Sequence, residues 1–133
     1  MTRAMSHRGF SAFAASRGIA FEVERTDGAA VLVCDDRLRV HVHPAPQGAL
    51  ALEARIAPMP GDARQADEVL DRAMAMSAGR LADLPESLVL SQDERELRLQ
   101  WPVAAEAGEA EFASALEAFL NALGEWRMTL GQL

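Results

Sequence analysis

Two histidines placed two residues apart are the clearest arrangement in this sequence that is capable of chemistry. His41 and His43 alternate with Val40 and Val42, so on an extended strand both imidazoles project from one face. A zinc site needs at least three protein ligands, and the third ligand would have to be His7 or a distant carboxylate. Two polar side chains on the solvated face of a strand explain the same pattern with fewer assumptions. We therefore expect no metal site and no cofactor.

Cys34 is the next candidate, as a nucleophile. A reactive thiolate needs a neighbouring base or cation that lowers its pKa, whereas Cys34 is followed by Asp35 and Asp36. We interpret Cys34 as a small, buried or half-buried strand residue. As the chain's one cysteine, it also rules out an intrachain disulfide and is compatible with a reducing cytoplasm.

Carboxylate pairs and missing residue types complete the search for catalysis. Of the three close acidic pairs, two lie at expected turns and one on the polar face of an expected helix: Asp35/Asp36, Glu94/Glu96 and Asp67/Asp71. The sequence contains no lysine, which excludes a phosphate-loop lysine and a Schiff-base lysine. We expect no catalytic residue and no enzymatic activity.

Composition limits the class of protein and its partners. The 133 residues are half apolar and carry a formal charge of -7, as suits one folded domain spanning residues 1–133. An acidic surface repels nucleic-acid phosphates and anionic lipids, so neither nucleic acid nor a membrane is an expected partner. No apolar run approaches the roughly 20 residues of a membrane span, and no secretory leader is evident. We expect a bacterial cytoplasmic protein.

The elements that must position these side chains follow from periodicity. A short helix is expected over residues 3–17, although Gly9 weakens it, and a possible extra strand over 19–25. Alternating apolar residues then predict three strands of an antiparallel meander, with turns at Asp27-Gly28 and Asp35-Asp36. The strands are centred on Val31–Cys34, Leu38–His43 and Leu50–Ile56.

The second half reads as helix, hairpin and helix. Asp62 is a suitable N-cap for a helix over 62–78, which Gly79 ends. Two strands, Leu88–Leu90 and Leu97–Trp101, flank a turn at Asp93-Glu94, and a linker is expected between Pro102 and Gly108. Apolar residues at i, i+4, i+7 and i+8 predict an amphipathic helix over about 109–130. The predicted fold is α+β, with three helices and an antiparallel sheet of about five to six strands, in the order α-β-β-β-α-β-β-α.

Two pairs of apolar residues allow two interpretations each. Met74 and Met76 either fill gaps in the core or form a surface that adapts to a partner, a common use of methionine. Phe10 and Phe13 belong either to the domain core or to an exposed docking groove. The sequence leaves both alternatives open.

The ordered pattern resembles the class I type III secretion chaperones. That family has an "LxLxA" strand, a proline-containing break and a helix rich in Leu and Met, similar to Leu50–Ala54, Pro58–Gly61 and the helix after Asp62. A hairpin with an acidic turn and a final helix of the type "FLNALGEWRMTL" follow, as they do here over Leu88–Trp101 and Phe119–Leu130. The resemblance covers nearly the whole chain and its acidic character, although the basic, glycine-interrupted first helix departs from it.

The resemblance implies a homodimer and a polypeptide client. The client would be the N-terminal segment of a secreted effector, which the chaperone keeps soluble and competent for secretion by binding it in an extended form. Candidate client contacts are Phe10, Phe13, Phe21, Val31 and Val33. The dimer interface would use the middle helix and the neighbouring strand, with an apolar patch that is complementary to itself: Val69, Ala73, Met74 and Met76. The alternative is a dimeric α+β regulatory or small-ligand-binding domain without a secretion client.

Overall fold

Three helices and six strands make up the described part of the chain. The computed structural model describes residues 6–17, 21–23, 29–34, 38–80 and 84–131. The helices are α1 (Arg8–Arg17), α2 (Ala63–Ala78) and α3 (Glu109–Thr129), with a short 3-10 turn at Pro46–Gly48. The strands are β1 (Phe21–Val23), β2 (Ala30–Cys34), β3 (Leu38–Pro44), β4 (Leu50–Pro58), β5 (Ser87–Leu90) and β6 (Glu96–Val103). This confirms the predicted α+β fold and its order of elements.

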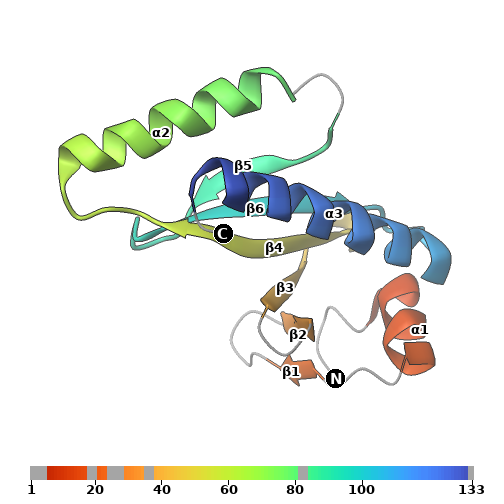
Figure 1. The fold of residues 1–133 in the computed structure, drawn as a ribbon. Coiled ribbons are helices and arrows are strands. Elements are labelled where there is room, and N and C mark those ends of the chain that lie inside the picture. The colour runs from red at the N-terminus through yellow and green to blue at the C-terminus, as the bar shows by residue number, and fades with distance from the viewer. Residues whose placement is uncertain (1–5, 18–20, 24–28, 35–37, 81–83, 132–133) are drawn as a thin grey trace.

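The strands form one antiparallel sheet in the order β1-β2-β3-β4-β6-β5. Neighbours in sequence are neighbours in space except at the centre, where β6 inserts between β4 and β5 after the chain has passed through α2. β1 and β5 are therefore the edge strands. Helix α3 lies across the sheet, and α1 packs beside the first turns of α3 (Figure 1).

Side chains alternate along the strands, so the sheet has one buried apolar face and one polar face. On β3 and β4, Val40, Val42 and Leu52 are fully buried, and they face α3 together with Leu99 of β6 because strand side chains alternate with period two. The core beneath α3 is completed by Phe112, Leu116, Phe119, Leu123 and Trp126. The opposite face of the sheet carries the intervening histidine, glutamate and arginine side chains.

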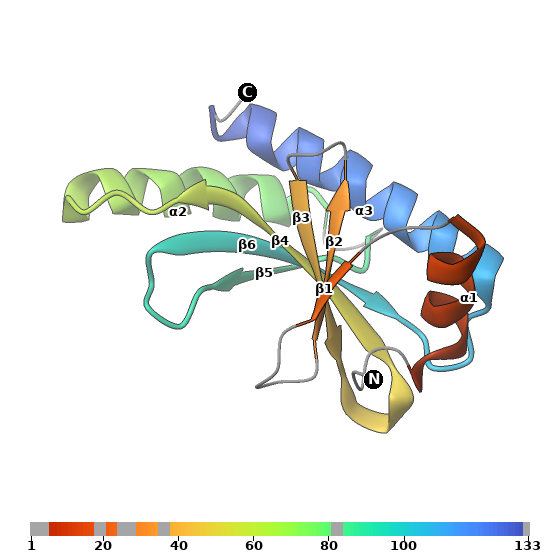
Figure 2. The ribbon, with the colours of Figure 1, turned by 90° about the horizontal axis from the view of Figure 1, so that it is seen from below.

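The sheet opens between β3 and β4. The two strands pair only from Pro44, opposite Leu50, to His41, opposite Glu53. Beyond this, β4 continues to Pro58, and its pairing with β6 has a register shift between Arg55 and Ala57. The first residues of β3 diverge from the last residues of β4, and Figure 2 shows β2 and β3 turning away from the rest of the sheet. A bulge increases local strand twist, and this register shift lies in the part of β4 beyond its pairing with β3.

A glycine allows α1 to approach the start of α3 closely. A Cβ added to Gly9 would lie 2.4 Å from the Ala107 carbonyl oxygen and 2.6 Å from that of Gly108. Any side chain at this position therefore overlaps the backbone that precedes α3. Gly9 lowers helix propensity, and it is required because two segments almost a hundred residues apart touch here.

Helix α2 is bounded as predicted but is attached sparsely. The Asp62 carboxylate accepts a hydrogen bond from the Gln65 amide at 3.1 Å, and Gly79 caps the C-terminus. Among the sixteen residues of α2 only Ala73 is buried. Figure 1 shows the helix standing away from the sheet, in contrast to α3.

Some predicted boundaries change. The first helix begins at Arg8 rather than at residue 3, and His7 directly precedes it; residues 1–5 lie outside the described part. Pro102 was expected in a linker, but it pairs with Ala51 inside β6. It is tolerated there because β5 reaches only as far as Gln100, so β6 has one neighbour at this point. The predicted turns at 27–28 and 35–36 also lie outside the described residues.

None of the helices in the described part is both long and apolar enough to span a membrane.

Candidate functional site

The two histidines lie on the polar face of β3, as the sequence predicts. Their rings stack with centroids 5.8 Å apart and an interplanar angle of 8°, and both side chains are half-buried. His43 Nε2 lies 3.4 Å from a carboxylate oxygen of Glu53. Within the described ranges, no three side chains of the His, Cys, Asp and Glu types gather where they could hold a metal ion. The side chain of Cys34 lies outside the described part.

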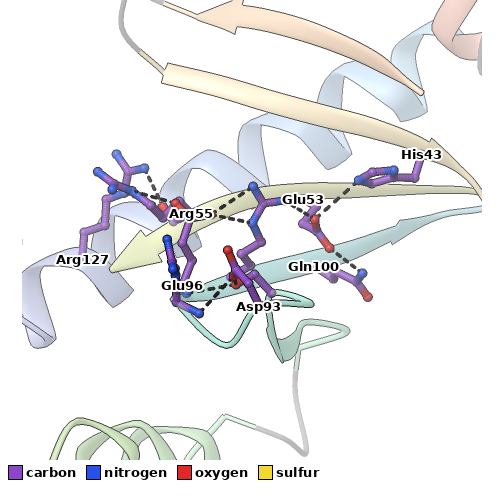
Figure 3. Close-up of polar contacts among 10 residues, drawn as sticks. His43, Glu53, Arg55, Asp93, Glu96, Gln100 and Arg127 are labelled. Carbon is purple, nitrogen blue, oxygen red and sulfur yellow. Dashed lines mark hydrogen bonds and ion pairs between the residues drawn. The ribbon is translucent and has the colours of Figure 1, made fainter. Parts of the chain in front are cut away.

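Glu53 is the centre of a polar network that spans three strands (Figure 3). It projects from the middle of β4 and is only 8 % exposed. Arg98 donates a hydrogen bond to Oε2 at 2.5 Å, and Gln100 donates one to Oε1 at 2.7 Å. Arg98 also contacts Glu96 two residues before it on β6. The buried carboxylate is thus contacted from both neighbouring strands, by His43 of β3 and by Arg98 and Gln100 of β6.

This environment holds Glu53 in its ionised form. Burial alone would raise the pKa of the carboxyl, but the contacts with His43, Gln100 and Arg98 outweigh it and lower the pKa from 4.5 to about 2. A carboxyl with such a pKa carries no proton near neutrality, so it does not serve as a general acid there. The network therefore links β4 to both neighbouring strands through an ionised carboxylate.

Phe10 and Phe13 lie in the core. Their exposed fractions are 0 % and 5 %, and their ring centroids lie 5.3 and 5.1 Å from that of Phe112 on α3. Of the two interpretations left open by the sequence, the structure places both rings on the core side. The expectation that they present an open contact surface for a client is therefore wrong for this structure: the close α1–α3 packing, made possible by Gly9, covers them.

The remaining predicted client contacts differ in accessibility. Val31 is 2 % exposed and Val33 is 38 % exposed, although both point to the same face of β2. Phe21 belongs to the edge strand β1, where it pairs with Leu32; its side chain lies outside the described part. Val33 is thus the predicted contact that the structure leaves open.

The four residues predicted for the dimer interface differ in how exposed their side chains are. Ala73 is buried, Val69 and Met76 are half-buried against the core, and Met74 is 69 % exposed. Successive helix residues are rotated by about 100°, so Met74 lies beside the stripe of the other three, next to Leu70. Part of the apolar arc of α2 is therefore not covered by the rest of the same chain.

A buried carboxylate ties the end of α2 to α3. Glu86, which is 8 % exposed, accepts hydrogen bonds from Arg80 Nε and Nη2 at 3.0 and 2.9 Å and from the Trp126 indole at 2.5 Å. Arg80 also pairs with Glu125 of α3, and these acids raise the pKa of its guanidinium. We name Arg80, Glu86 and Trp126 the carboxylate clamp.

Sequence reasoning missed both the Glu53 network and the carboxylate clamp. Glu53 occupies a polar position in an alternating strand, which usually indicates solvent, and its burial depends on neighbours 45 and 47 residues away. Glu86 follows Pro85 and is not part of an alternating or helical pattern that would indicate its burial. The one available signal was an arginine or glutamine at each matching polar position of the later strand, Arg98 and Gln100.

The comparisons with known proteins agree with one another. A family model described as Tir chaperone protein (CesT) family matches residues 11–127. The fold is similar to a chain in the ExsC–ExsE complex, with 17% identity, a TM-score of 0.71 and coverage of 96% of this chain and 95% of that one. It is also similar to a chain in the HopA1–SchA chaperone–effector complex, with 15% identity, a TM-score of 0.65 and coverage of 93% and 97%.

A third similar structure is that of the Yersinia pestis type III secretion chaperone SycH in complex with a stable fragment of YscM2. Here the identity is 17%, the TM-score 0.58 and the coverage 87% and 94%. No curated protein sequence matches the chain. These similarities show that the chain shares its α+β fold with these three chains. Because the family model covers most of its length, the chain belongs to the Tir chaperone protein (CesT) family.

Proposed function

We propose that this protein is a type III secretion chaperone that binds the N-terminal segment of an effector in the bacterial cytoplasm and keeps it soluble and competent for secretion. The observation that carries the proposal is the family match over residues 11–127. The polar groups of the molecule agree with a binding role rather than a catalytic one, because Glu53 and Glu86 are both fully engaged in contacts within the chain. No chemical step is proposed for it.

The proposal includes a homodimer built on α2. A helix with one buried residue in sixteen leaves an apolar arc in water unless a partner covers it. Leu70 and Met74 lie on the part of this arc that faces away from the chain's own core, and Met74 is the more exposed. A two-fold interface requires the same patch from each subunit, and a single helix crossing its own copy meets that requirement.

The client segment is proposed to run along the β1–β2 side of the sheet. β1 is an edge strand, and an edge strand offers main-chain donors and acceptors to an added extended segment. Val33 supplies open apolar surface beside it. Phe10 and Phe13 support this region from within the core rather than by touching the client.

Co-purification tests the function. The tagged chain is isolated from its source bacterium, the protein bound to it is identified, and the chain is then co-expressed with that protein's N-terminal segment. We expect a complex of two chaperone chains with one segment by light scattering coupled to gel filtration, and protection of that segment in limited proteolysis. A dimer that retains no polypeptide, or that carries a small molecule instead, would favour the regulatory-domain alternative.

Substitutions on α2 test the dimer separately. Met74→Asp buries a charge at the proposed interface and should give a folded monomer in gel filtration. Ala75→Asp, on the exposed polar side of the same helix, is the matched control and should remain dimeric. A dimeric Met74→Asp variant would show that α2 is not the interface.

A further inference from the structure

His7 lies at the start of α1 with both of its ring nitrogens engaged. Nδ1 accepts a hydrogen bond from the Phe10 amide at 3.1 Å, and Nε2 lies 2.8 Å from the Ala104 carbonyl oxygen. The residue is only 4 % exposed. Its main-chain carbonyl accepts from the Ser11 amide at 3.0 Å. His7 is therefore the N-cap of α1, a position usually taken by Ser, Thr, Asp or Asn.

The two partners fix the protonation of the ring. An amide only donates, so Nδ1 must offer a lone pair, and a carbonyl oxygen only accepts, so Nε2 must carry the proton. The ring is thus held as the neutral Nε2–H tautomer. A second proton would go to Nδ1, where it would face the Phe10 N–H and remove its acceptor. It would also place a positive charge at a helix N-terminus, where the macrodipole disfavours one.

The loop beside His7 offers the ring no counter-charge. A pocket of about 390 Å³ lies next to the ring, and its other lining residues are Ser6 and residues 44–50. None of these side chains is ionisable. On α1 the next residue is Arg8, an exposed cation, which cannot stabilise a second positive charge.

The carboxylates near the start of α3 are exposed or bound to other groups. Glu106, in the turn before α3, is exposed. Glu109 accepts a hydrogen bond from Ser16 Oγ at 3.0 Å, and Glu111 accepts one from the amide of the N-cap residue of α3 at 2.6 Å. Across the described residues, the ring of His7 contacts an amide and a carbonyl, not a carboxylate.

The contacts of His7 fasten the N-terminal end of α1 to the turn before α3. Gly9 meets the backbone of the same turn, and the rings of Phe10 and Phe13 then pack on Phe112. A helix of ten residues is not stable alone in water. Loss of the cap and of the carbonyl contact therefore favours release of α1 as a unit, which exposes the three rings.

We propose that His7 is a pH-sensitive latch, which holds α1 against the start of α3 while the ring is neutral and releases it when the ring takes a second proton. The released state then binds one proton more than the docked state. Docking is at full strength above about pH 6.5, where an exposed imidazole titrates, and weakens as the pH falls through this range. The latch rests on contacts within the chain and does not depend on the proposed chaperone function.

Hydrogen exchange measured by mass spectrometry on the full chain tests the latch. Protection of peptides from α1 is followed from about pH 8 to about pH 5, with exchange rates normalised at each pH to those of an unstructured peptide. We expect constant protection above about pH 7 and a fall of up to about tenfold per pH unit below about pH 6. Peptides from β5, at the far edge of the sheet, should show no such fall. Constant protection of α1 over the whole range overturns the latch.

The three histidines of the chain allow a matched control. His7→Asn keeps a side-chain acceptor for the cap but does not titrate, so protection of α1 should no longer fall with pH. His41→Asn/His43→Asn removes the other two imidazoles and should retain the fall. An equal fall in both variants, or its loss in the double variant alone, contradicts the role of His7.

The unsubstituted protein decides the case in which His7→Asn leaves α1 unprotected at every pH. Imidazole nitrogen NMR should show the Nε2–H tautomer of His7 at about pH 8. The doubly protonated ring should appear together with the loss of α1 protection. An Nδ1–H tautomer at high pH, or a charged ring while α1 stays protected, would refute the coupling.

Discussion

The contact of Gly9 with the backbone before α3 gives the sharpest prediction, because it reverses the usual sign of a substitution. Gly→Ala within a helix normally stabilises by about 1 kcal/mol. At Gly9 the new Cβ would lie 2.4 Å from the Ala107 carbonyl oxygen, where ordinary contact begins at 3.4 Å. The helix must therefore move by about 1 Å, the difference between these two distances, against rigid backbone on the other side.

The expected magnitude follows from what that movement disturbs. Overpacking of this kind costs about 1–3 kcal/mol, and complete detachment of α1 would expose Phe10 and Phe13, at about 1.5–3 kcal/mol for each ring. After the gain of about 1 kcal/mol in helix propensity is subtracted, we expect overpacking at Gly9→Ala to lower the free energy of unfolding by up to about 2 kcal/mol. Full detachment sets the upper limit at about 5 kcal/mol.

Urea unfolding monitored by circular dichroism measures this, at one fixed protein concentration because the stability of the proposed dimer would depend on concentration. Gly124→Ala is the matched control, since nothing lies within 4 Å of a Cβ added there and it sits inside α3. It should stabilise the protein by about 0.5–1 kcal/mol. If both variants are stabilised alike, α1 does not pack against the start of α3 as described.

Two further predictions concern the buried carboxylates. Because the pKa of Glu53 is lowered from 4.5 to about 2, its ionisation stabilises the fold above pH 4.5, and this contribution, about 3 kcal/mol, is lost as the pH falls towards 2. Thermal melts across this range should fall more steeply for the unsubstituted protein than for Glu53→Gln; parallel curves would contradict the lowered pKa. Trp126→Phe removes one donor to Glu86 and should cost about 1–2 kcal/mol, whereas an unchanged melting temperature would show that the indole hydrogen bond contributes nothing.

The fold was predictable wherever its signals are local. Strict alternation over Leu38–His43 and Leu97–Trp101 marks strands, Asp62 and Gly79 mark the ends of α2, and the apolar stripe marks α3. These patterns depend on residues within a few positions of one another, so a single sequence contains them.

The site was less predictable because its features depend on contacts between distant residues. Phe10 reads equally well as core or surface until Phe112 is known to lie against it. Gly9 reads as a weakness of the first helix until its neighbour is seen to be the backbone at Ala107.

The sparse attachment of α2 has a consequence for how the free chain behaves on dilution. Besides buried Ala73 and half-buried Val69 and Met76, the helix is tied to the rest of the molecule just past its C-terminal end, through the carboxylate clamp. Regions with few buried contacts open at low free energy, and their amide hydrogens exchange early. In the proposed dimer, the N-terminal turns of α2 should therefore lose protection first as the subunits separate, and the exchange rate of this helix would then measure subunit association.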